Sequence, residues 1–76
     1  MRVTLLWVEG DAAADFRDLI GTSGEIRRKG KRLTFMPDRR GDWLSVVAVA
    51  EQSDAAGRWR VTSSLSFIYV FRLLKG

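Results

Sequence analysis

The chain has 76 residues, enough for a single domain spanning residues 1–76. It contains no cysteine and no histidine, which excludes disulfides, thiolate catalysis, metal sites built from these residues and the commonest general base. With 46% hydrophobic and 29% charged residues, it has the composition of a folded domain. We therefore expect a binding domain that is not an enzyme and uses neither a cofactor nor a metal.

The net charge of +4 is distributed unevenly along the chain. Residues 1–20 sum to −2, whereas residues 21–40 sum to +5. Most of the cations are arginines, whose planar guanidinium matches phosphate and carboxylate oxygens. This distribution predicts that the second quarter of the chain faces an anionic partner.

The two most apolar stretches are both short. Residues 3–8 fall below the length of a signal-peptide core, and residues 65–74 would cross only about half a membrane and include Arg72. We expect a cytoplasmic protein that does not enter the membrane.

The first elements in chain order are a strand and a helix. Residues 2–9 are rich in β-branched and aromatic side chains, which favours a strand with Val3, Leu5 and Trp7 on one face. Asp11 is a good N-cap, and the apolar stripe that ends at Ile20 predicts a short helix terminated by Gly21.

The remainder of the chain has the pattern of strands. Residues 25–28 and 31–36 flank Lys29 and Gly30, a two-residue hairpin turn in which Arg28 would face Lys31. Residues 37–42 have turn composition, and residues 43–51 read as a buried strand. Residues 58–74 are too long for one straight strand, so a break is expected near residues 62–64.

These elements predict an α+β fold, with one short helix packed on a strongly coiled, mainly antiparallel sheet of about five strands in the order β-α-β-β-β-β. Because several strands are apolar on both faces and one helix covers only one, either the sheet curls into a barrel or a second copy forms a homodimer. The predicted core consists of Val3, Leu5, Trp7, Phe16, Leu19, Ile20, Ile26, Leu33, Phe35, Val47, Val49, Trp59, Val61, Leu65, Phe67, Tyr69 and Phe71.

The strongest local signal for function is the basic hairpin, where five of the six residues 27–32 are cationic. Like charges opposite one another cost stability, which suggests a negative partner, although lysine and arginine also protect exposed strand edges. A β-ribbon can enter a nucleic-acid groove, and Arg58 and Arg60 add a second basic pair beside Trp59. The candidate anion-binding residues are Arg27, Arg28, Lys29, Lys31, Arg32, Arg39, Arg40, Arg58 and Arg60.

A second reading is a protein-interaction module. Asp11, Asp15 and Asp18 would form an acidic stripe on one helix face, which is typical of either a solvated face or a docking surface. Trp43 is the best candidate for an exposed aromatic contact. The first hypothesis is therefore a domain whose basic hairpin binds nucleic acid or an acidic protein surface. The alternative is an assembly subunit or a small inhibitor, of the kind mobile elements and phages encode, that acts through an apolar sheet face or the acidic helix.

Overall fold

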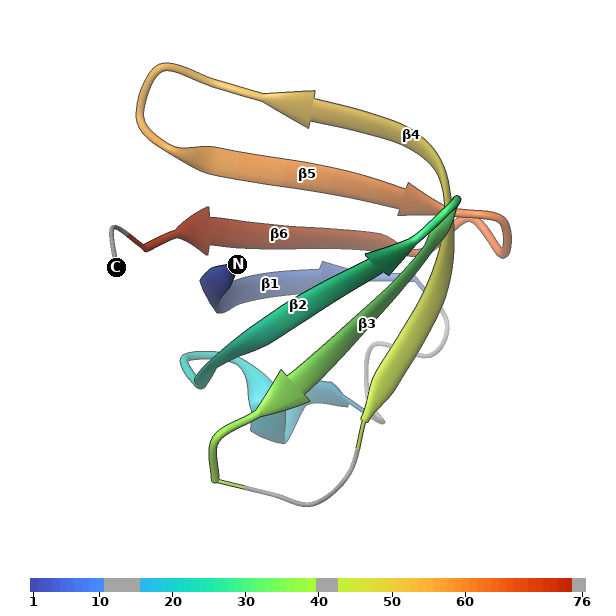
Figure 1. Cartoon of the computed structure of the whole chain (residues 1–76). Coiled ribbons are helices and arrows are strands. Elements are labelled where there is room, and N and C mark those ends of the chain that lie inside the picture. Colours follow the sequence, from blue (N-terminus) through green and yellow to red (C-terminus); the bar gives the residue numbers. More distant parts are fainter. Residues whose placement is uncertain (11–15, 40–42, 75–76) are drawn as a thin grey trace.

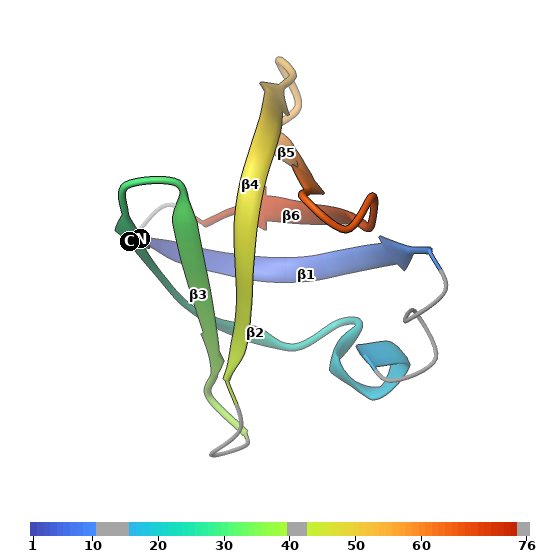
Figure 2. The same cartoon turned by 90° about the vertical axis from the view of Figure 1, so that its right-hand side faces the viewer.

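The computed structural model describes residues 1–10, 16–39 and 43–74. Their backbone forms a closed antiparallel barrel in the order β1-β2-β3-β4-β5-β6 (Figures 1 and 2). Each strand pairs with the next one along the chain, and β6 returns to pair with β1. The strands are β1 (Arg2–Glu9), β2 (Ser23–Lys29), β3 (Arg32–Pro37), β4 (Leu44–Ser53), β5 (Arg58–Ser63) and β6 (Ile68–Leu73).

The core lies inside the barrel and follows the alternation of the strands. On β5 and β6 the inward side chains are Trp59, Val61, Tyr69 and Phe71, all buried, and the residues between them face outward. The complete buried apolar set is Val3, Leu5, Val8, Leu19, Ile26, Leu33, Phe35, Leu44, Ala48, Trp59, Val61, Tyr69 and Phe71.

The predicted α+β fold with a helix is wrong, because the described residues are nearly all sheet. Helical structure among them is confined to Phe16 and the 3-10 turn η1 (Arg17–Leu19), and the beginning of the predicted helix, residues 11–15, lies outside the described residues. The apolar stripe does contact the core, but Ile20 is already extended. The Gly21 amide donates to the Leu5 carbonyl at 2.7 Å, so hydrogen bonds to β1 replace further helical turns.

The number of strands also differs from the prediction. Residues 58–74 form two strands with a turn between Ser63 and Ile68, which gives six strands where about five were expected. Of the two ways to cover the second apolar face, the structure has the closed barrel. Because the barrel already encloses this apolar face, no second copy is needed to cover it, and the homodimer stays a prediction.

Two β-bulges change which side chains are buried. The register shifts between Leu5 and Trp7 on β1 and between Ala48 and Ala50 on β4, and a bulge of this kind re-aims the side chains that follow it. Trp7 is consequently 53% exposed and Val49 61% exposed, although both were predicted in the core. Leu65, also predicted in the core, lies in the β5–β6 turn and is 72% exposed.

The hairpin between β2 and β3 forms one residue later than predicted. Its two turn residues are Gly30, with φ 61°, and Lys31, and Lys29 pairs with Arg32. Arg28 therefore lies opposite Leu33 and not Lys31, and the only like charges paired in this register are Lys29 and Arg32. Glycine adopts this positive φ without strain, which places the turn at Gly30.

Candidate nucleic-acid interface

Arg28 is exposed but is bound to other residues of the chain. Its guanidinium donates two hydrogen bonds to Glu51, at 2.9 and 2.5 Å, and lies 5.8 Å from the centre of the Trp59 ring. The Trp59 indole N–H donates to the same carboxylate at 3.1 Å. These three side chains, from β2, β4 and β5, form what we call the barrel clasp. Since its charge is already neutralised, we leave Arg28 out of the proposed interface.

The other cations of the hairpin lie around the turn between β2 and β3, which we call the hairpin tip; Figure 2 shows this turn at one side of the barrel. The tip consists of Arg27, Lys29, Lys31 and Arg32, all of them exposed. Within residues 1–10, 16–39 and 43–74, none of the four forms an ion pair. The hairpin tip therefore presents four positive charges to solvent, none of them held in an ion pair by the described residues.

Three exposed carboxylates outside the barrel clasp are each bound to another group of the chain. The Met1 amino group lowers the pKa of Glu25 through a hydrogen bond of 2.9 Å. Arg2 lowers the pKa of Asp38 in the same way through two guanidinium hydrogen bonds. Backbone N–H donation from residue 58 is the main cause of the lowered pKa of Asp54. Glu25 also interacts electrostatically with Arg27, whereas Asp38 follows the far end of β3 and Asp54 follows β4.

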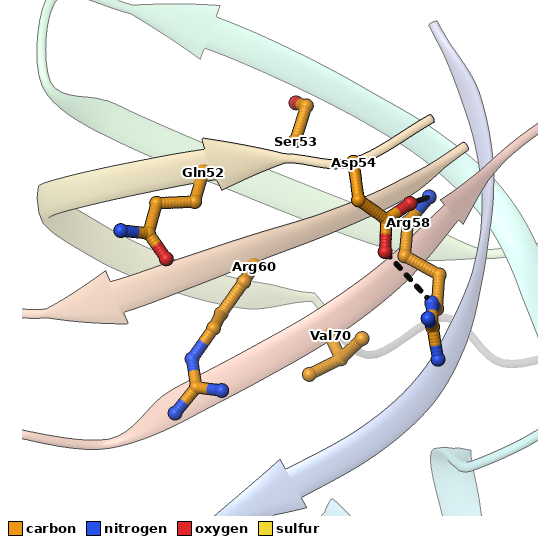
Figure 3. A pocket seen from close by; sticks show the side chains of 6 residues that line it. All are labelled: Gln52, Ser53, Asp54, Arg58, Arg60 and Val70. Atoms are coloured by element: carbon orange, nitrogen blue, oxygen red, sulfur yellow. Dashed lines mark hydrogen bonds and ion pairs between the residues drawn. The ribbon is translucent and has the colours of Figure 1, made fainter. Parts of the chain in front are cut away.

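A second cationic surface covers the outside of β5 and β6. A surface hollow of about 660 Å³ opens there (Figure 3). Arg58 is held by Asp54 at 2.9 Å, whereas Arg60 forms no ion pair within the described part of the chain. Arg72, which pairs in register with Arg58, is exposed on the same face. The hollow is lined by Gln52, Ser53, Asp54, Arg58, Arg60 and Val70.

Sequence reasoning missed Arg72 and Trp7 as candidate surface residues. The alternation of residues 58–74 could have identified Arg72, because it shares the even, outward parity of Arg58 and Arg60. Trp7 gave no such signal, since strict alternation places it beside Leu5 in the core. Only the bulge turns Trp7 outward, opposite Val70.

The remaining sequence-predicted residues are dispersed. Trp43 is 70% exposed just before β4, and Arg39 is exposed after β3. Arg40, Asp11 and Asp15 lie outside the described residues, so the acidic stripe is represented only by Asp18, which is exposed in η1. In the described part of the chain, no three acidic side chains are grouped as a metal site requires.

Comparison with protein-family models, with curated proteins and with solved structures finds no match to this chain. Over the described residues, the chain has no helix with the length and apolar character needed to cross a membrane.

Replacing Glu51 with glutamine is expected to lower the free energy of unfolding by about 1 kcal/mol at neutral pH, because it removes the charge that holds Arg28. Hydrogen bonds from Arg28 keep the pKa of Glu51 below its ordinary value of 4.5. A lowered pKa in the folded state stabilises above pH 4.5, and this contribution is lost as the pH falls through the folded-state pKa.

Urea denaturation of the parent and the Glu51→Gln variant at several pH values measures this effect. The difference between them should shrink as the pH falls below 4.5. Glu9→Gln, which removes an exposed carboxylate without a described ion pair, is the matched control. A constant difference at all pH values would contradict a contribution from the ion pair.

Proposed function

We propose that this chain is a non-enzymatic domain that binds nucleic acid through the hairpin tip. The observation that supports the proposal most is the exposure of four cations at one end of the β2–β3 hairpin, none of which is in an ion pair within the described residues. Unpaired clustered charge is costly to a folded protein and attracts a polyanion.

The arrangement of the tip suits a phosphate backbone. Arg27 pairs with Thr34, which in turn pairs with Ser45 on β4, so hydroxyl groups continue the outward face next to the cations. The Thr34 and Ser45 hydroxyls lie 3.1 Å apart. Arginine, lysine, serine and threonine side chains are the usual partners of phosphate oxygens, and a two-stranded ribbon fits a nucleic-acid groove.

The test is a variant that removes two tip charges, Arg27→Gln with Arg32→Gln. Each neutralised phosphate contributes roughly 0.9 to the exponent with which duplex affinity depends on salt, so losing two contacts should weaken binding about 60-fold at roughly 0.1 M salt. Fluorescence anisotropy with a labelled DNA duplex measures the loss.

The matched control changes the net charge equally at a site far from the tip. Ala55→Glu with Ala56→Glu places two negative charges in the β4–β5 turn, where both alanines are exposed and which lies at the opposite side of the molecule in Figure 1. If both variants bind equally weakly, the effect is one of net charge, and the hairpin tip is not the binding site.

A second candidate function is a protein-interaction module, favoured by the exposed apolar side chains Trp43, Val49 and Leu65, at 70%, 61% and 72%. The apolar sheet face first considered for this role is the barrel interior, so the contact would have to use these outward residues. Partner capture that survives Arg27→Gln with Arg32→Gln but is lost in Trp43→Ala would favour this function over the first.

A further inference from the structure

Trp7 is placed on the outside of the barrel by a local irregularity that alternation does not predict. Leu5 and Val8, on either side of this irregularity, are both buried, at 0% and 3% exposure. Because the register shifts between Leu5 and Trp7, the indole leaves the inward row and becomes 53% exposed. Exposing a large aromatic side chain to water is unfavourable because its apolar surface is not buried. Bulges that re-aim a side chain in this way are common next to functional sites.

The exposed indole forms one wall of a second hollow, of about 510 Å³, lined by Trp7, Val8, Arg17 and Ile20. The opposite wall is anchored to β1: the Gly21 amide donates to the Leu5 carbonyl, and the Leu5 amide donates to the Thr22 carbonyl at 3.0 Å. Arg17 is exposed and forms no ion pair within the described residues. The hollow thus combines an aromatic face, aliphatic side chains and an available guanidinium.

On its other side, Trp7 borders the cationic surface of β5 and β6. The outward row across the barrel runs from Trp7 to Val70 and then to Arg60. Since neighbouring strands are about 4.8 Å apart, Arg60 lies roughly 10 Å from Trp7, two strands away. Arg72, two residues beyond Val70 on β6, is also exposed. Cations therefore flank the indole on both sides.

We propose that this surface, Trp7 with Arg17, Arg60 and Arg72, binds single-stranded nucleic acid, with an unpaired base stacked on the indole and the adjacent phosphates held by the arginines. The inference rests on the proposed nucleic-acid function and adds to the hairpin tip a second surface that is specific for the single-stranded form. Base stacking on an aromatic side chain requires a base that is not enclosed in a duplex, and a positively charged groove beside the aromatic follows the backbone. A partner that docked on Trp7 through apolar contacts alone would not require arginines on both sides of the indole.

The experiment compares an oligothymidylate with a duplex of equal phosphate number, using the full chain and the Trp7→Ala variant. Stacking of one base predicts that Trp7→Ala weakens single-strand binding about 5- to 150-fold while duplex affinity changes less than about twofold. Trp7→Phe should restore most of the single-strand affinity, because phenylalanine also offers a ring face. Trp43→Ala, at another exposed tryptophan, is the matched control and should bind like the parent.

The outcomes separate the two proposals. Parent protein that binds neither oligonucleotide at low salt overturns the proposed function and this inference together. Binding of both probes with no effect of Trp7→Ala overturns the inference alone. Equal losses for duplex and single strand in a folded Trp7→Ala variant also overturn it, because stacking on an unpaired base is specific to the single strand. A thermal melt of each variant shows that it is folded.

Discussion

Replacing Phe71 with alanine is expected to unfold the barrel. The Phe71 ring is 2% exposed, and its centre lies 5.6 Å from the Phe35 ring and 5.5 Å from the Trp59 ring. It pairs in register with Leu5 on one side and with Trp59 on the other, so it joins three strands and contacts a fourth across the interior. Truncating a buried phenylalanine costs about 3–5 kcal/mol through lost burial and the cavity left behind.

A core of this size rarely supplies more than about 3–5 kcal/mol in total, so the variant has little stability left. Circular dichroism and urea denaturation measure the outcome. Leu65→Ala, which truncates a side chain that is 72% exposed, should change stability by less than about 0.5 kcal/mol. A Phe71→Ala variant that unfolds cooperatively near the parental midpoint would show that the ring does not hold the strands together.

Raising the salt concentration from about 50 to about 200 mM is expected to weaken duplex binding by roughly 150-fold. The four cations of the hairpin tip would each neutralise one phosphate, which gives a log–log slope of about −3.6. Removing two of them in Arg27→Gln with Arg32→Gln should reduce the slope to about −1.8 and the loss over the same range to roughly 12-fold.

The barrel clasp provides the control for this slope. Because Arg28 is bound to Glu51, Arg28→Gln should leave the slope unchanged within error, even though it removes one positive charge from the same hairpin. A slope that drops by about 0.9 in Arg28→Gln would mean that Arg28 leaves Glu51 to contact phosphate. A slope near zero in the parent would remove the electrostatic basis of the proposed function.

The sequence predicts what depends on local pattern. The first strand, the basic hairpin and the division of residues 58–74 into two strands follow from alternation and turn residues, and the structure confirms them. Most predicted core positions on β2, β3, β5 and β6 are buried, because alternation is uninterrupted in these strands.

What the sequence does not predict depends on contacts between distant residues. The bulges at Trp7 and Val49 arise where two paired strands must curve around the barrel, and the residues themselves give no sign of it. The pairing of Arg28 with Glu51 requires β2 and β4 to approach the same end of the barrel. The hairpin tip was therefore found from composition, whereas the Trp7 surface was found only from the fold.

The pairing of β1 with β6 links the two ends of the chain, since Val3 lies opposite Leu73 and the Leu74 amide donates to the Arg2 carbonyl at 2.9 Å. Until the final strand docks, β1 and β5 each expose an unpaired edge with its backbone donors and acceptors. Contacts this distant along the chain form late and slowly, because ring closure of a long segment is entropically costly. A folding intermediate in which residues 68–73 have not yet docked would accordingly be open to strand exchange with neighbouring molecules, so the docking of β6 decides whether the barrel closes or aggregates.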